Sequence, residues 1–156
     1  MIDNRTASYA ALILRLGTGG MFLAHAALKF FVFTPASTAK FFQTVGLPGP
    51  LGPVTILIET SVGFALILGV VPRLAALAGV PGLLGAIFTV HLANGFFFNN
   101  PNGGWEFPAF WVLALVAQAL LGDGPFTLVQ TSRLGKAFVP REKHAHHACV
   151  TMEMQR

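Results

Sequence analysis

The amino-acid sequence predicts an all-α membrane protein, a four-transmembrane-helix bundle. Of its 156 residues, 54% are hydrophobic and only 10% are charged, whereas about a quarter of the residues are charged in an average soluble domain. The apolar residues are gathered into four runs, at 9–33, 51–71, 74–98 and 105–122. Because a membrane-spanning helix needs roughly 17 to 25 mainly apolar residues, we expect each run to cross the bilayer once.

The boundaries of the runs support this division. The first run is too long for a cleaved signal peptide and contains three basic side chains, Arg15, His25 and Lys29. Proline- and glycine-rich stretches separate the later runs at 47–53, 72–73 and 99–106. From residue 129 the chain is polar and charged, which is typical of a disordered segment. We therefore expect a transmembrane bundle at 1–128 and a largely disordered cytoplasmic tail at 129–156.

Basic residues outside the four runs are concentrated on one side of this bundle. That side carries Arg5, Arg73, Arg133, Lys136, Arg141, Lys143 and Arg156, and the other side carries Lys40 alone. Since cytoplasmic loops are enriched in lysine and arginine, both termini are expected in the cytoplasm. The bases are scattered without interleaved aromatic residues, so nothing indicates binding to nucleic acid.

The first and third runs share a pattern around a histidine. FLAHAALKFF (22–31) and FTVHLANGFF (88–97) both read F-x-x-H-x-A-x-x-F-F, at a constant offset of 66 residues. LGVVP (68–72) and LGDGP (121–125) share L-G-x-x-P. These matches predict two helical hairpins related by an axis along the membrane normal, the parallel kind of internal repeat. The alternative is chance matching among apolar segments.

The repeat predicts a polar pocket in the outer leaflet. At about 1.5 Å per residue, both histidines lie roughly 25 Å from the cytoplasmic ends of their helices. His25 shares a helix face with Lys29, and His91 shares one with Asn94. Glu59 enters the membrane from the outer side, and an ionisable group inside lipid is a functional-site hypothesis by default. We expect the ligand-binding residues to be His25, Lys29, Glu59, His91, Asn94, Trp105 and Glu106.

Most of these residues also have a structural explanation. Lys29 can extend its ammonium group to the outer interface, and Glu106 can simply stabilise the start of its helix. Arg15 lies nearer the cytoplasmic face and can extend inward or form a structural ion pair with Glu59. If all of these explanations hold, the chain is a scaffold without a ligand.

Two groups of side chains are candidate metal ligands. His25, His91 and Glu59 supply donors that suit a divalent ion such as zinc or copper. The tail contains a short metal-binding composition, HAHHAC, with His144, His146, His147 and Cys149. The alternative for the tail is a solvated segment that binds no metal.

The same residues carry a resemblance to the DoxX family. The first run follows the pattern R-L-x-x-G-x-x-F-x-x-H-x-x-x-K, with Arg15, Leu16, Phe22, His25 and Lys29. The likeness covers roughly residues 8 to 128 and continues through G-L-P (46–48), Glu59, L-x-L-G-x-x-x-R (66–73), His91 with N-G-F-F (94–97), G-G-W-E (103–106) and L-G-D-G-P (121–125). The resemblance implies a four-helix protein of the bacterial inner membrane, associated with membrane redox complexes and defence against oxidative stress. It implies no particular catalysed reaction.

The leading functional hypothesis is an integral membrane component of an oxidoreductase system, linked to quinone, to oxidative stress or to sulfur redox chemistry, with a polar pocket in the outer leaflet. A quinone needs an apolar slot with hydrogen-bond donors for its carbonyls, which His25, Lys29 and His91 can supply. The alternatives are a protein that handles copper or zinc ions and a non-catalytic transporter or scaffold. Whether the chain is an enzyme stays open at this point. The expected partners are the lipid bilayer, a redox-enzyme subunit and further copies of the same chain.

Overall fold

The chain folds into helices joined by short connections. The computed structural model describes residues 4–132, with this order of elements: α1 (Asn4–Ala27), the π-helix η1 (Leu28–Val32), α2 (Pro35–Thr44), α3 (Leu51–Leu68), α4 (Pro72–Ala86), the π-helix η2 (Ile87–His91), the 3₁₀-helix η3 (Leu92–Asn94) and α5 (Glu106–Leu121). Between residues 4 and 132 the only β pairing is one isolated bridge, between Val70 and Val129. The prediction of an all-α protein is confirmed for this part of the chain.

Three helical stretches are long and apolar enough to cross a membrane, namely Thr6–Val32 (27 residues), Leu51–Leu68 (18 residues) and Pro72–Asn94 (23 residues). The fourth apolar helix, α5, has 16 residues. At about 1.5 Å per residue it measures roughly 24 Å, less than a hydrocarbon core of about 30 Å. Length and composition therefore support three of the four predicted spans, and the fourth predicted run holds a shorter apolar helix.

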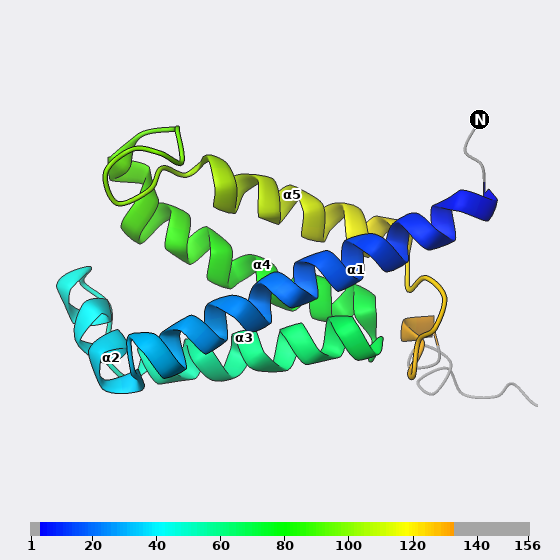
Figure 1. The fold of residues 1–156 in the computed structure, drawn as a ribbon, viewed down its shortest axis with the longest axis horizontal. Helices are drawn as coiled ribbons and strands as arrows, with labels where there is room; N and C mark the ends of the chain where they lie inside the picture. The colour runs from blue at the N-terminus through cyan, green and yellow to red at the C-terminus, as the bar shows by residue number, and fades with distance from the viewer. Residues whose placement is uncertain (1–3, 133–156) are drawn as a thin grey trace, which may run out of the picture.

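The helices pack as two pairs. Figure 1 shows α1 lying along α3 and α4 lying along α5. α1 also contacts α5, and α3 also contacts α4. We call the end that carries α2 and the loop of residues 95–105 the distal end. The opposite end, which we call the terminal end, carries the start of α1, the turn between α3 and α4, and residues 122–132.

Two glycines allow α1 and α3 to approach closely. A methyl group added at Gly63 would lie 2.7 Å from Leu23 Cδ2 and 3.0 Å from the Gly19 carbonyl oxygen. One added at Gly19 would lie 3.0 Å from the Gly63 carbonyl oxygen. Small residues at such contacts are characteristic of helices that associate in lipid, where close packing replaces the hydrophobic effect. This contact positions the distal halves of α1 and α3, which carry Lys29 and Glu59.

The buried core lies between the two pairs, and all four long helices contribute to it. Its members are Phe22, Val62, Leu66, Ala75, Ala76, Leu83, Trp111 and Leu115. Outside this core, many large apolar side chains face outward, among them Leu57, Phe88, Leu113 and Leu120. Exposed apolar patches of this extent do not occur on ordinary soluble monomers. The helices are therefore those of a membrane protein, with lipid as their environment.

Arg15 joins the terminal end of α1 to the segment that follows α5. Its side chain is 1% exposed. Its guanidinium donates to the backbone carbonyls of Asp123, Pro125 and Phe126 at 3.0–3.2 Å. Arginine can serve three carbonyls at once because its donors form a rigid planar fork. The contact fixes residues 123–126 against α1.

The first residues of the predicted tail are paired with the turn between α3 and α4. The N–H of Val71 donates to the Val129 carbonyl at 2.8 Å, and the N–H of Val129 donates to the Gly69 carbonyl at 3.0 Å. Asp123 accepts from the N–H and the hydroxyl of Thr131. Val129 and Thr131, beyond the predicted boundary at 128, thus also contact the helical bundle and the segment after α5. Residues 133–156, with the predicted tail ligands His144, His146, His147 and Cys149, lie outside the described residues.

The sequence analysis did not predict α2, which lies across the distal end next to η1 and α3 (Figure 1). Thr34 is its N-cap and accepts a hydrogen bond from the Ser37 N–H, and Pro35 occupies the first helical position. This order of residues is a recognised signal for the start of a helix. A methyl group at Gly52 would lie 2.9 Å from the Ala39 nitrogen, so α2 packs closely against the start of α3.

Candidate functional site

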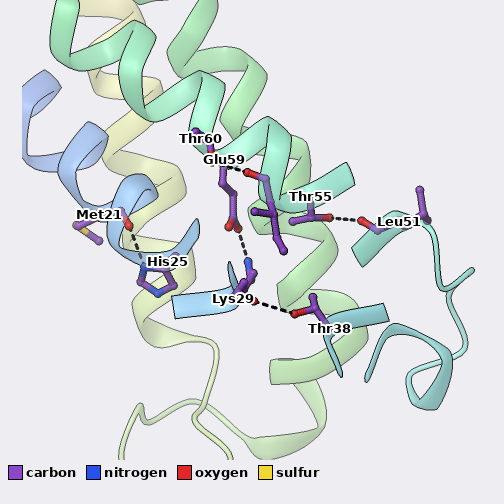
Figure 2. Close-up of polar contacts among 9 residues, drawn as sticks. Met21, His25, Lys29, Thr38, Leu51, Thr55, Glu59 and Thr60 are labelled. Atoms are coloured by element: carbon purple, nitrogen blue, oxygen red, sulfur yellow. Dashed lines mark hydrogen bonds and ion pairs between the residues drawn. The ribbon is translucent and has the colours of Figure 1, made fainter. Parts of the chain in front are cut away.

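Lys29 and Glu59 form an ion pair between the distal halves of α1–η1 and α3. Figure 2 shows the two side chains directed at each other, with Nζ donating to Oε1. The side chains are 24% and 14% exposed, respectively. The second carboxylate oxygen, Oε2, is buried without a hydrogen-bond partner. A single charge inside lipid costs about 2.5–3.5 kcal/mol on insertion scales, so pairing makes both residues tolerable within apolar helices.

The backbone around Lys29 is irregular. Lys29 lies in the π-helix η1, where the Phe33 N–H reaches back five residues to the Leu28 carbonyl at 3.0 Å. The Thr38 hydroxyl of α2 lies 3.4 Å from the Lys29 carbonyl and 2.9 Å from the Thr34 carbonyl (Figure 2). π-turns inside helices are frequent at functional sites. α2 is thus attached to the residue that carries the ammonium group.

His25 lies in α1, one turn before Lys29 of η1. Its Nδ1 is 2.9 Å from the Met21 carbonyl. A carbonyl oxygen only accepts, so Nδ1 carries the proton and Nε2 of the neutral ring is left as an acceptor. The imidazole also packs against the indole of Trp111 in α5, with ring centroids 5.0 Å apart. His25 therefore brings α1 into contact with α5, one turn before Lys29.

His91 and Asn94 organise the distal loop of the other helix pair. His91 Nδ1 lies 2.9 Å from the Gly103 carbonyl. The Asn94 amide donates to the carbonyls of Val90 and Gly103, both at 3.1 Å, and to Asn102 at 3.3 Å. These bonds hold the end of α4–η2 against the loop of residues 95–105.

Trp105 and Glu106 also belong to this loop. Glu106 Oε2 accepts from the Phe98 N–H at 3.2 Å, so the carboxylate closes the loop at the start of α5. The Trp105 ring packs edge-on against Phe96, with centroids 4.7 Å apart. Both contacts favour the structural explanation of these two residues.

The predicted ligand-binding residues thus fall into two groups. His25, Lys29 and Glu59 lie together on α1–η1 and α3. The hydrogen bonds of His91, Asn94 and Glu106 are made to the loop of residues 95–105 and its flanking turns. The sequence analysis expected one pocket because residue counts place both histidines at the same depth in the membrane. The direction in which each side chain points also depends on the rotation of its helix, which residue counts do not give.

The predicted ion pair between Arg15 and Glu59 is wrong. Glu59 pairs with Lys29, and Arg15 bonds to backbone carbonyls at the terminal end. The segment after α5 returns to α1, and its backbone carbonyls accept hydrogen bonds from the guanidinium. This contact could not be predicted from the spacing of residues in the sequence.

The predicted metal site of His25, His91 and Glu59 is not formed. Among residues 4–132, no three His, Cys, Asp or Glu side chains lie close enough together to hold a metal ion. His25 and His91 turn their Nδ1 atoms to different carbonyls, Met21 and Gly103. The geometry of these donors does not support a shared metal ion.

The sequence analysis did not select Trp111 for the site. Its indole is 3% exposed, contacts His25 and Phe22, and has an N–H without an acceptor. The signal for its inward direction was Gln118, which lies seven residues further along α5, about two helical turns away, and is fully buried. A polar residue at this spacing in an apolar run marks the face that avoids lipid.

An apolar groove of about 530 Å³ lies beside this group, between α1–η1 and α3. Its walls include Leu23, Phe30, Phe31, Ile56, Thr60 and Phe64. Phe30 and Thr60 directly follow Lys29 and Glu59 in the sequence, so the groove adjoins the segments that carry the ion pair. The Thr60 hydroxyl donates to the Ile56 carbonyl, which leaves the groove with an essentially apolar lining.

Comparisons with known proteins agree with the resemblance found in the sequence. The family model of DoxX matches residues 10–92. A Bacillus subtilis (strain 168) protein named "Putative oxidoreductase CatD" is 31% identical over 120 residues, which cover 77% of this chain and 84% of that protein. No solved structure matches the chain significantly. The chain therefore belongs to the DoxX family, as its sequence motifs predicted.

Proposed function

We propose that this DoxX-family protein is a membrane component of an oxidoreductase system and binds a quinone-type ligand beside Lys29 and Glu59. The observation that carries the proposal is the ion pair within the distal half of α1–η1 and α3, whose second carboxylate oxygen has no partner. Ionisable groups in membrane helices are retained where they serve a site or a pathway. The relative named as an oxidoreductase supports the same class of system.

The side chains of this group suit the head group of a quinone. Its carbonyl oxygens accept hydrogen bonds, and its reduction to a quinol takes up two electrons and two protons. Lys29 Nζ can donate to a carbonyl, and Glu59 can pass a proton through its free Oε2. His25 Nε2, on the residue one turn before Lys29, is a second acceptor that can take up a proton. The electrons are supplied by a partner oxidoreductase subunit, and this chain supplies the binding site and the protons.

The surroundings suit the apolar part of such a ligand. The groove of about 530 Å³ between α1–η1 and α3 is lined by apolar side chains and adjoins the segments that carry the ion pair. Ligand sites of this kind are mostly apolar, with a few polar groups that orient the ligand. An isoprenoid tail can reach such a groove directly from the lipid.

The proposal includes a membrane topology. Four transmembrane helices place the termini on the cytoplasmic side of a bacterial inner membrane, because the basic residues lie mainly on that side. α5 spans with 16 residues because the bilayer thins locally and flanking residues such as Trp105 extend to the interface. The Lys29–Glu59 pair then lies in the outer leaflet.

Quinone binding to the purified protein tests the proposal. Decylubiquinone is titrated by calorimetry into the chain reconstituted in lipid nanodiscs. Lys29→Gln and Glu59→Gln should each weaken binding by about tenfold or more, since a hydrogen bond to a charged group contributes about 1.5–3 kcal/mol and 1.4 kcal/mol is tenfold.

Lys40→Gln is the matched control, because Lys40 is an exposed lysine at the same distal end. Its affinity should equal that of the wild type. Absence of binding in the folded wild type, or equal affinity in all four proteins, would leave the ion pair with a purely structural role and favour a scaffold.

A further inference from the structure

Trp111 carries a buried hydrogen-bond donor without an acceptor. The residue is 3% exposed, and its indole N–H has no partner. A buried tryptophan N–H usually finds a partner, because leaving a buried donor unsatisfied is unfavourable. An unmet donor in the best-packed part of the molecule therefore needs an explanation.

The ring around this donor is held firmly. The Trp111 indole packs against Phe22 at a centroid distance of 4.6 Å, against His25 at 5.0 Å and against Phe107 at 6.0 Å. Only His25 among these three neighbours is polar, and it is half-buried. The indole is thus positioned by aromatic contacts, while its N–H is not used by them as a conventional hydrogen-bond donor.

Two further polar groups without a partner lie on α3 and α1. Glu59 Oε2 on α3 is a buried acceptor without a partner. His25 Nε2 on α1 is free because Nδ1 is bonded to the Met21 carbonyl. The series Trp111, His25, Lys29 and Glu59 is joined by the ring contact of Trp111 with His25 and by the ion pair of Lys29 with Glu59, and His25 and Lys29 lie four residues apart in the chain. Its two ends offer an N–H donor and a charged pair.

We propose that the Trp111 N–H donates to one ring oxygen of the quinone-type ligand, while the opposite ring oxygen lies at Lys29 and Glu59. A flat ring with oxygens at both ends is the ligand class that would satisfy both ends of this series. The inference rests on the proposed function and adds a binding residue on α5.

Trp111→Phe tests the inference, since it removes the N–H and keeps an aromatic ring. Without ligand, the variant should remain folded with a somewhat lower thermal midpoint, because phenylalanine is smaller than tryptophan and leaves a cavity in the core. Calorimetric titration with decylubiquinone in nanodiscs should give a dissociation constant about tenfold higher. Phe110→Leu, at an exposed position next to Trp111 on α5, is the control and should bind like the wild type.

An analogue that lacks one of the two ring oxygens sharpens the test. Its affinity should be nearly the same for the wild type and Trp111→Phe, because the hydrogen bond to Trp111 is missing in both cases. An unchanged affinity of Trp111→Phe for decylubiquinone would overturn the inference.

The two proposals fail in different ways. If Lys29→Gln weakens binding and Trp111→Phe does not, the assignment of Trp111 is wrong and the proposed function stands. If the wild type binds no decylubiquinone, the proposed function is wrong and the inference falls with it.

Discussion

Two cations inside the apolar stretch α1–η1 are stabilised in different ways. Lys29 is paired with a carboxylate on α3, whereas Arg15 is surrounded by three backbone carbonyls at the terminal end. The difference follows from their chemistry. A guanidinium presents several donors in a fixed fork, and an ammonium group acts as a compact charge that favours a single anion. Only the Lys29 site leaves an acceptor, Glu59 Oε2, for a further partner.

Glu59→Leu should destabilise the protein strongly. It leaves the Lys29 ammonium without a counter-charge, and removing one partner of a buried ion pair costs about 3–5 kcal/mol in the free energy of unfolding. The double variant Lys29→Met with Glu59→Leu should recover most of this loss, because replacing both partners by apolar groups is often neutral. Denaturation in detergent measures the free energy of unfolding of both variants. An unchanged free energy of unfolding in Glu59→Leu would show that the ion pair is fully solvated.

For individual residues, the sequence predicted which polar side chains belong to the candidate site better than it predicted the contacts of those side chains. His25, Lys29 and Glu59 could be selected because polar groups are rare in apolar runs. The partner of Glu59 could not, since both Arg15 and Lys29 lie on α1 and only the packing of α1 against α3 decides between them. Trp111 was missed because an interfacial tryptophan and a buried one look alike in a single sequence.

The helical elements differ from regular α-helices where they carry the polar residues. Both π-helices lie at distal helix ends, and they contain Lys29 and His91. After η1, Thr34 has φ 64° and ψ 150°, a conformation that favours glycine and is strained for a β-branched residue. Hydropathy predicted that helices pass through these positions. It could not predict π-turns or strain, because they arise from contacts such as that of Thr38 with Lys29.

Thr34→Gly should stabilise the protein by about 1 kcal/mol. Glycine removes strain of about 1–3 kcal/mol at this backbone conformation, and replacing the capping side chain by glycine costs only a few tenths of a kcal/mol. Ser37→Gly, inside α2, should destabilise by about 0.5–1 kcal/mol instead, since glycine weakens a helix interior. The two variants are compared by their thermal midpoints in the same detergent. An equal decrease of the midpoint in both would contradict backbone strain at Thr34.

Gly63→Ala should destabilise the α1–α3 pair by about 1–3 kcal/mol. The added methyl group would lie 2.7 Å from Leu23 and 3.0 Å from the Gly19 carbonyl, and overpacking a close contact costs that much. Gly17→Ala in α1 is the control, because nothing lies within 4 Å of its added methyl group. It should be neutral or slightly stabilising. Chemical denaturation distinguishes the variants, and equal stability would mean that the contact is loose.

For the whole molecule, the pairing of α1 with α3 and of α4 with α5 separates two kinds of polar residue at the distal end. One pair carries the charged group of Lys29 and Glu59, and the other uses His91, Asn94 and Glu106 to close its loop. The sequence repeat matched His25 to His91, and the two imidazoles do share one feature, an Nδ1 bonded to a carbonyl. Their surroundings differ because only His25 faces Trp111.

The membrane topology can be measured directly. A reporter fused after Arg156 should be active on the cytoplasmic side, and one inserted near Asn102 should be active on the outer side, because most basic residues outside the apolar runs belong to the segments that the sequence predicts to be cytoplasmic. Opposite activities would move the Lys29–Glu59 pair to the inner leaflet and would contradict an even number of crossings with cytoplasmic termini.

The central claim is that a quinone-type ligand binds at Lys29 and Glu59, and cross-linking with a photoreactive short-chain quinone tests it most directly. The labelled peptides, identified by mass spectrometry, should come from residues 22–31, 56–64 and 107–115. Labelling should disappear when decylubiquinone is added in excess and should fall in Lys29→Gln but not in Lys40→Gln. Label concentrated in the loop of residues 95–105, or label that decylubiquinone does not displace, would contradict the claim.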